Sequence, residues 1–176
     1  MENCAEKTIS SKKIFDGKII SVSNDEVELP DGTLHAREVV RHKGGVVVVS
    51  EKSGRVLMVK QFRYPLGQET FELPAGKLDR EDETPLDTAK RELEEETGHT
   101  AKHWGYMGYI YTTPGFCDEK LHLFLAQGLT YDKTKKLDDE IIDFYEIDKD
   151  EVFEMIKVGT VQDAKSISAI FRAYSV

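Results

Sequence analysis

The chain has 176 residues, of which 39% are hydrophobic and 32% charged, and this favours one compact domain that buries a core without disulfide or metal staples. The formal net charge of −9 and the pI near 5.1 leave no basic surplus to neutralise a phosphate backbone, which argues against nucleic acid as a partner. An acidic protein that binds phosphates must use a few placed cations or a metal ion.

The two cysteines, Cys4 and Cys117, lie far apart and form no CxxC or zinc-like cluster. This usage indicates a reduced, cytoplasmic setting. The N-terminal residues are polar and lack the apolar stretch of a signal peptide, and no apolar run approaches the length that spans a bilayer. We therefore expect a cytoplasmic protein without a membrane partner.

The N-terminal part of the chain predicts strands. Residues 7–41 carry spaced apolar positions around the turn signal Pro30-Asp31-Gly32, so we expect short strands around a hairpin there. Gly44-Gly45 marks a break before Val46–Val49, an apolar run typical of a strand buried on both faces. Residues 55–62 form the returning strand.

The clearest helix is expected at residues 85–97. Thr84 is a good N-cap with Asp87 three residues on, Pro85 takes the tolerated first position, and Gly98 follows the end. Strands and helices mix without strict β–α–β alternation, which favours an α+β fold with a mixed sheet over a doubly wound one. The remaining expected elements are strands at 104–111, 120–127 and 141–147, an exposed loop at 130–140, and helices at 148–158 and 163–174.

The expected helix carries an acidic stripe. Residues three and four apart share a helix face, so its glutamates repel one another unless a hard divalent cation joins their oxygens. A solvated acidic face is the alternative. Two features favour the cation: the acids lie at the C-terminal end, where the helix dipole disfavours them, and the preceding loop, Leu73–Gly76, has a glycine that permits close backbone approach. The acidic stripe is Glu92, Glu95 and Glu96, and the core-facing stripe is Leu86, Ala89 and Leu93.

The segment from Gly76 to His99 resembles the Nudix box, GX5EX7REUXEEXGU, in which U is a bulky apolar residue. The run RELEEETG from Arg91 matches the second half of the pattern completely. Six residues instead of five separate Gly76 from the isolated Glu83, so Asp82 is a second candidate for its role. The final apolar position holds His99. Both departures concern loop geometry more than the metal-binding end.

The resemblance implies a Nudix fold, a mixed β-sheet sandwiched between helices with an N-terminal antiparallel β segment. We expect residues 1–43 to form that segment and residues 44–176 the Nudix hydrolase domain. The resemblance also implies Mg²⁺, with Mn²⁺ as a possible substitute, held by Glu92, Glu95, Glu96 and the backbone carbonyl of Ala75. Glu95 is also a catalytic candidate, as is Arg91, which is expected to orient the glutamates by salt bridges.

Stretches outside the box resemble the ADP-ribose pyrophosphatases of this family. Pro114 lies fifteen residues beyond His99, an offset that resembles their marker proline, although Pro-Gly is also an ordinary turn. Arg63 is a candidate diphosphate contact because a guanidinium fork matches phosphate oxygens; a surface charge is the alternative. Phe15 is a candidate adenine platform or a core residue. The full substrate-binding set is Phe15, Arg37, Arg41, Arg63, Pro114, Gly115 and Glu119.

The resemblance implies that a metal-assisted water attacks one phosphorus of ADP-ribose and releases AMP and ribose 5-phosphate. We expect the general base on the loop before the last strand, at Glu140, with Asp139 and then Glu119 as alternatives. The N-terminal segment is expected to swap across a homodimer, because a lone two-stranded unit is marginal in water. The competing functions are a Nudix pyrophosphatase for another nucleotide sugar or dinucleotide, and a non-catalytic ADP-ribose sensor.

Overall fold

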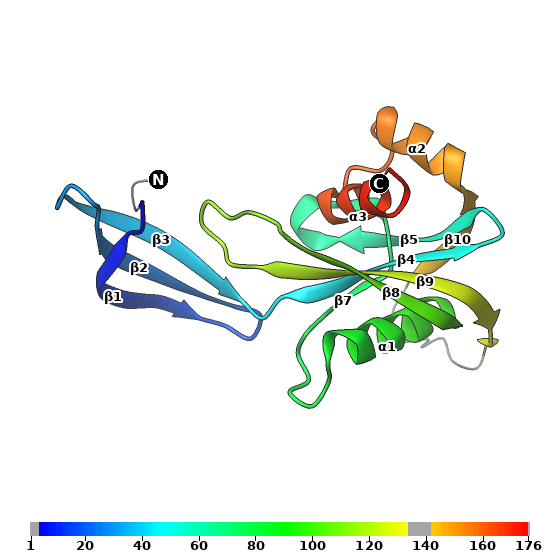
Figure 1. Cartoon of the computed structure of the whole chain (residues 1–176), viewed down its shortest axis with the longest axis horizontal. Coiled ribbons are helices and arrows are strands. Elements are labelled where there is room, and N and C mark those ends of the chain that lie inside the picture. Colours follow the sequence, from blue (N-terminus) through cyan, green and yellow to red (C-terminus); the bar gives the residue numbers. More distant parts are fainter. Residues whose placement is uncertain (1–3, 134–141, 176) are drawn as a thin grey trace. The chain divides into compact units, whose positions relative to one another are not determined.

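The computed structural model describes residues 4–133 and 142–175 (Figure 1). Within these ranges the chain forms two compact units. The smaller unit comprises the chain up to Gly44 together with Tyr111–Lys120, and the larger comprises Gly45–Ile110 and Leu121–Val176. The division therefore places a segment from the middle of the sequence with the N-terminal strands.

The smaller unit is built on a three-stranded antiparallel sheet in the order β1-β2-β3. Its strands are β1 (Lys7–Asp16), β2 (Ile20–Glu28) and β3 (Leu34–His42). The expected turn is confirmed by the Gly32 N–H, which donates to the Leu29 carbonyl over 2.9 Å. The expectation of short strands was wrong, since each has 9 or 10 residues. β1 is exposed along its whole length, and its sequence lacks the apolar alternation that marks a half-buried strand.

The larger unit contains a seven-stranded mixed sheet, in which β4 runs parallel to β9 and antiparallel to β5 and β7. The main path has the order β10-β5-β4-β9-β8, with β6 joined to β5 and β7 to β4. This confirms the α+β fold with a mixed sheet. The strands are β4 (Gly45–Lys52), β5 (Arg55–Arg63), β6 (Gln68–Glu72), β7 (Ala75–Lys77), β8 (His99–Tyr111), β9 (Lys120–Tyr131) and β10 (Asp143–Asp148), and a short 3-10 helix η1 (Tyr64–Leu66) follows β5.

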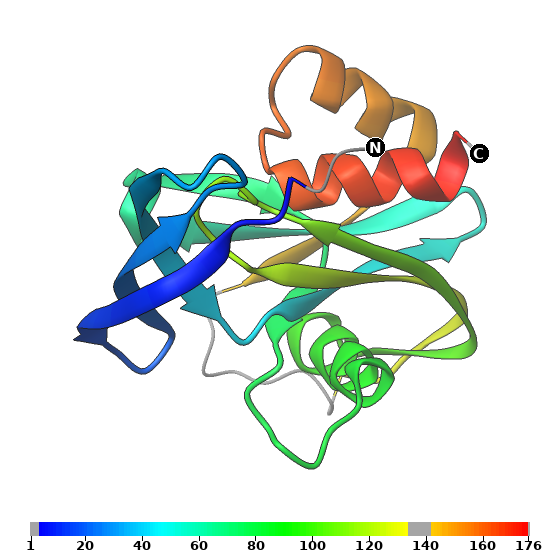
Figure 2. The same ribbon diagram turned by 60° about the vertical axis from the view of Figure 1, so that its left-hand side comes forward.

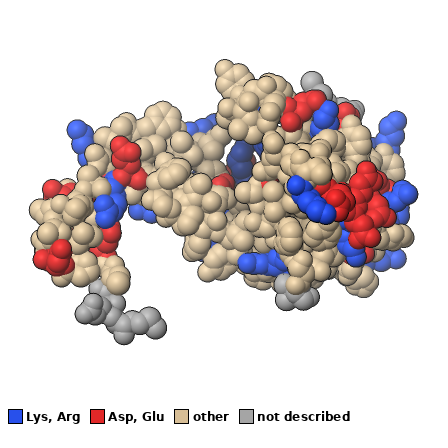
Figure 3. Space-filling model, turned by 90° about the horizontal axis from the view of Figure 1, so that it is seen from above, with Lys and Arg blue, Asp and Glu red and all other residues tan. Residues whose placement is uncertain are grey.

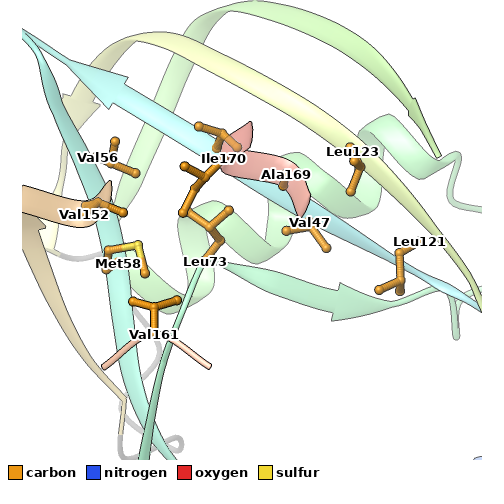
Figure 4. Close-up of a cluster of buried hydrophobic side chains, with 11 residues drawn as sticks. Val47, Val56, Met58, Leu73, Leu121, Leu123, Val152, Val161, Ala169 and Ile170 are labelled. Carbon is orange, nitrogen blue, oxygen red and sulfur yellow. The ribbon is translucent and has the colours of Figure 1, made fainter. Parts of the chain in front are cut away.

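Helices cover both faces of the larger sheet, α1 (Pro85–Thr97) on one and α2 (Lys149–Lys157) and α3 (Ala164–Tyr174) on the other (Figures 1 and 2). The run Val46–Val49 divides between two buried clusters, as expected for a strand covered on both faces. Figure 4 shows the cluster toward α2 and α3, to which Val47, Ala169 and Ile170 belong. Val46 and Val48 join the cluster toward α1. Each fully buried aliphatic side chain contributes about 1.5–3 kcal/mol to folding.

Helix α1 begins and ends as its sequence predicts. The Thr84 hydroxyl accepts the Asp87 N–H and the Asp87 carboxylate accepts the Thr84 N–H, which completes a capping box. Gly98 ends the helix at φ 69°, a left-handed conformation that favours glycine. His99 then packs its buried ring against Tyr131 and Phe144, at centroid distances of 5.0 and 5.4 Å. Burial lowers the pKa of His99, so a neutral imidazole fills the apolar position of the box.

Strands β4 and β5 pair only beside their turn and then separate. Their register covers Glu51↔Val56 and Lys52↔Arg55. The first residues of β4 pair with β7 instead of β5. Next to them, the Val48 N–H donates to the Pro74 carbonyl over 2.9 Å. The segment from Leu73 to Gly76 is therefore fastened to β4 between the diverging strands, where α1 packs against β7.

Several element boundaries differ from the sequence-based expectation. β8 begins at His99 rather than 104, and β9 continues to Tyr131 rather than 127. The short strands β6 and β7 were not expected at all. On the face drawn in Figure 3, basic and acidic side chains lie interspersed. Within the described ranges no helix is long and apolar enough to cross a membrane.

Candidate active site

Arg91 holds the acidic side chains of α1 together. Its Nη1 lies 2.7 Å from both Glu92 Oε1 and Glu95 Oε2, and its Nε lies 3.1 Å from Glu83 Oε1. Burial opposes the charge of Arg91, but the hydrogen bond to Glu95 and the charge of Glu92 outweigh it and raise the Arg91 pKa. One partly buried guanidinium therefore offsets the repulsion among three carboxylates, which is the geometry that an orienting role requires.

The isolated glutamate of the box, Glu83, is held by one hydroxyl group and two arginines. Glu83 accepts the Thr88 hydroxyl over 3.0 Å and pairs with both Arg91 and Arg80. Asp82, the alternative, is exposed. Arg80 belongs to the loop that is one residue longer than the pattern, and its Nη2 also reaches Glu95 at 3.7 Å. The longer loop thus adds a second cation beside the α1 carboxylates.

Two glutamates of α1 meet the backbone of the Ala75–Gly76 loop. The Ala75 N–H donates to Glu96 Oε2 over 3.2 Å, and Glu96 is buried. A Cβ atom at Gly76 would overlap the carboxyl group of Glu92. Gly76 is therefore required for the close approach of Glu92 to the loop, independent of any turn conformation.

These residues fit a divalent cation by their chemistry and by this close packing. Carboxylate and carbonyl oxygens are the hard donors that such ions take. Glu92 packs against Gly76 and Glu96 binds the neighbouring Ala75, so both carboxylates meet the same stretch of backbone. Among the described residues, no three acidic, histidine or cysteine side chains already form a metal-holding group. Glu92 and Glu95 instead pair with Arg91.

An ion-pair network around the buried Glu72 borders the same loop. Glu72, whose side chain is 3% exposed, accepts Arg63 Nε over 2.7 Å and Arg63 Nη2 and Lys165 Nζ over 2.5 Å each. Burial alone would raise the Glu72 pKa, but the bonds from Arg63, the charge of Lys165 and the Thr70 hydroxyl lower it to about 2. The charge of Glu96 is among the causes that raise the Arg63 pKa, so this network lies near the α1 carboxylates.

Sequence reasoning missed this network apart from Arg63. Glu72 and Lys165 lie 93 residues apart; the stretch from Glu72 to Gly76 resembles the ADP-ribose pyrophosphatases, but Lys165 belongs to no periodic or motif pattern. The only available signal was a glutamate that directly precedes the loop. The three charged groups border a hollow of about 320 Å³, which is completed by Pro65, Leu66, Gln162 and neighbouring residues.

The other predicted substrate residues lie in the smaller unit. Arg37 makes a two-pronged bond to Glu6, with Nη2 2.7 Å from Glu6 Oε1. Arg41 pairs with Asp118 over 3.2 Å. Phe15 is half exposed, which contradicts the alternative of a core residue. These cations and this ring remain at the surface of their own unit.

The segment that contains Pro114 is fastened to β3. The Val40 N–H donates to the Phe116 carbonyl over 2.7 Å. Pro114 and Gly115 form an exposed turn. Glu119 accepts the Thr112 hydroxyl over 2.8 Å and lies 3.4 Å from His42 Nδ1. Arg41 and Glu119 therefore lie in the same unit: Arg41 pairs with Asp118, which precedes Glu119, and Glu119 lies beside His42, which follows Arg41.

The predicted residues fall into two groups. The larger unit brings together the candidate metal and diphosphate residues, and the smaller unit carries the others. Glu140 and its alternative Asp139 lie outside the described residues. The larger unit contains Arg63, Ala75, Arg91, Glu92, Glu95 and Glu96, and the smaller contains Phe15, Arg37, Arg41, Pro114, Gly115 and Glu119.

Comparison with known families matches the chain to two family models. Residues 40–169 match the NUDIX domain model, and residues 6–40 match the model of the nucleoside diphosphate sugar hydrolase N-terminal domain. The chain belongs to the Nudix family, whose hydrolases use divalent metal ions. It is an enzyme of that hydrolase class.

Two curated relatives cover nearly the whole chain. An ADP-ribose pyrophosphatase of Bacillus subtilis (strain 168) is 43% identical over 97% of this chain and 93% of its own length. A protein named methanol dehydrogenase activator, from Bacillus methanolicus, is 41% identical over 94% of this chain and 90% of its own. A crystal structure of an ADP compounds hydrolase superposes with a TM-score of 0.85 at 15% identity, over 97% of this chain and 92% of that one. The last similarity supports the fold alone.

The Glu72 network predicts a specific loss of stability. We expect Glu72→Gln to lower the free energy of unfolding at pH 7 by about 3 kcal/mol, because it leaves Arg63 and Lys165 without their buried anion. Urea denaturation measures the change. Glu69→Gln, which removes the carboxylate of the more exposed Lys60 pair, should cost less than about 1 kcal/mol.

The pH dependence of that difference follows from the Glu72 pKa. A carboxylate whose folded pKa is lowered from 4.5 to about 2 stabilises the fold fully above 4.5 and loses the contribution as the pH falls toward 2. The gap between the native chain and Glu72→Gln should therefore narrow below pH 4.5. A gap that stays constant between pH 7 and pH 3 would contradict the assignment.

Proposed function

We propose that the chain hydrolyses the pyrophosphate bond of ADP-ribose, with Mg²⁺ as cofactor, and releases AMP and ribose 5-phosphate. The observation that carries the proposal is the packing of Glu92 and Glu96 on the Ala75–Gly76 loop. The 43% identity to the Bacillus subtilis ADP-ribose pyrophosphatase supports the choice of substrate. The proposed metal-binding residues lie in the larger unit.

Glu92, Glu95, Glu96 and the backbone carbonyl of Ala75 would hold the metal. When bound, a divalent ion supplies charge neutralisation for the diphosphate and polarisation of the attacking water. Arg91 orients these carboxylates through its three ion pairs. This arrangement would let an acidic protein take an anionic substrate without a broad basic surface.

Arg63 is the proposed diphosphate contact of the larger unit. Its side chain is 40% exposed although two of its nitrogens bind Glu72. Within the described part of the chain its Nη1 makes no hydrogen bond, so that nitrogen is available to a phosphate oxygen. Phe15, Arg37, Arg41, Pro114, Gly115 and Glu119 are proposed as further substrate-binding residues.

The assay that tests the activity uses purified protein and ADP-ribose, with and without Mg²⁺, and separates AMP and ribose 5-phosphate by chromatography. We expect Mg²⁺-dependent release that disappears in Glu96→Gln, because the change removes a charged ligand. Glu154→Gln, on the exposed side of α2, controls for the loss of a carboxylate and should retain the rate. Release that survives in Glu96→Gln would show a contaminating hydrolase.

The same assay tests the general base. Glu140 is proposed to accept the proton of the attacking water, with Asp139 and Glu119 as the next candidates. Glu140→Gln should lower turnover sharply and leave metal binding in place. An unchanged turnover would move the role to Asp139 or Glu119.

A second candidate is hydrolysis of another nucleotide sugar or dinucleotide. The match of residues 6–40 to the nucleoside diphosphate sugar hydrolase N-terminal domain favours it. Competition among ADP-ribose, ADP-sugars, GDP-mannose and NADH separates these substrates. Binding of ADP-ribose without turnover of any of them would instead support the non-catalytic sensor.

We also propose that the N-terminal β segment, residues 1–43, forms a homodimer by exchange between two chains. The support is its exposed apolar surface: Ile14 and Leu34 are 59% and 56% exposed, and an isolated sheet of this size has little core of its own. The cytoplasmic location expected from the cysteines stays a prediction.

Light scattering after size exclusion tests the assembly. At micromolar concentration we expect a mass twice the 20.0 kDa of one chain. Ile14→Glu, which places a charge on the apolar surface, should shift the mass toward one chain. A mass of a single chain for the native protein would refute the dimer.

A further inference from the structure

The first turn of α3 contacts the loop of the candidate site from the side away from α1. The Leu73 N–H donates to Ser166 Oγ over 2.7 Å, and the Ser166 hydroxyl donates to Asp163 Oδ2 over 2.5 Å. Two residues later in the chain, the Ala75 N–H donates to Glu96. The backbone between Leu73 and Ala75 is therefore fixed at both ends, by α3 and by α1.

Lys165 is the cation of this arrangement on α3. Its Nζ lies 2.5 Å from Glu72 Oε2 and 2.8 Å from Asp163 Oδ2, and its side chain is 14% exposed. Glu72 Oε2 also accepts Arg63 Nη2. One oxygen of Glu72 thus receives both a lysine of α3 and the arginine that is proposed to contact the diphosphate.

The charges of this network balance only when Lys165 is present. Glu72 and Asp163 are both anionic, and Lys165 lies between them with a bond to each. Arg63 alone would leave Asp163 without that cation and would place two carboxylates near one another in a poorly solvated region, which is unfavourable. Glu72 would then move away from Asp163, and both Arg63 and the adjoining Leu73 would move with it.

We propose that Lys165 is a positioning residue for the candidate active site: through Glu72 it fixes the guanidinium of Arg63, and with Ser166 it fixes the Leu73–Gly76 loop against Glu96. The proposal rests on the proposed pyrophosphatase function for its effect on rate. Its effect on the loop is independent of the substrate. Lys165 itself makes its two salt bridges to Glu72 and Asp163 and acts through them.

Three variants test the role of the charge. Lys165→Met removes the cation and keeps most of the apolar stem, whereas Lys165→Arg keeps the cation. Lys157→Met is the matched control, since Lys157 also forms an ion pair, with Glu154 at 3.0 Å, but is 73% exposed on α2. Each variant is assayed at a temperature at which circular dichroism shows it folded.

We expect Lys165→Met to lower kcat/KM for ADP-ribose by about 10- to 100-fold, the usual effect of removing a partner that orients a metal-site ligand. Lys165→Arg should restore most of the rate, and Lys157→Met should match the native protein. Amide hydrogen exchange at Leu73 and Ala75 should accelerate in Lys165→Met and stay slow in the other two. A role in overall stability alone would not separate Lys165→Arg from Lys165→Met in rate at this temperature.

Lys165→Met with native kcat/KM and native exchange at Leu73 and Ala75 would overturn the proposal. If the methionine variant does not fold, Lys165→Gln replaces it under the same criteria, since glutamine keeps a hydrogen-bond donor without the charge. A native protein that fails to hydrolyse ADP-ribose would refute the proposed function only. In that case the exchange at Leu73 and Ala75 still decides whether Lys165 positions the loop.

Discussion

The close approach of α1 to the backbone at Ala75–Gly76 is the contact on which the rest of the site depends. Gly76 leaves room for the Glu92 carboxyl, and the Ala75 N–H binds the buried Glu96. The fold provides this contact because β4 and β5 separate after their turn, so that the loop is fastened to β4 by the Pro74 carbonyl. Helix packing, strand divergence and one glycine therefore act together at a single point.

Ion pairs with a single arginine stabilise the acidic face of α1 without a large basic surface. Like charges on one helix face, near the end that disfavours anions, would destabilise α1 on their own. Arg91 lies among Glu83, Glu92 and Glu95 and offsets that repulsion from within the helix. The Glu72 network likewise pairs opposite charges beside the loop, with one buried anion between two cations. Arg91 thereby orders carboxylates that are proposed to hold the divalent ion, and the Glu72 network orders the residues that flank the loop.

The sequence was sufficient for features that depend on local chemistry. The capping box at Thr84, the helix end at Gly98 and the two-faced burial of Val46–Val49 all follow from neighbouring residues, and the structure confirms them. The length of β1 was underestimated, because a strand that is exposed along its whole length does not show the apolar alternation of a half-buried one. The link between Glu72 and Lys165 depends on where α3 docks, 93 residues away, and no local pattern carries that information.

The dependence of the metal site on Gly76 is measured by titrating Mn²⁺ into Gly76→Ala and following its binding by electron paramagnetic resonance. Gly105→Ala is the matched control, because a Cβ there would meet only Leu125 Cβ at 3.9 Å. We expect Gly76→Ala to weaken Mn²⁺ binding by about tenfold or more, since the added methyl displaces Glu92, and Gly105→Ala to bind as the native protein does. Native Mn²⁺ affinity in a folded Gly76→Ala variant would show that the metal site does not depend on the close approach of Glu92 to Gly76.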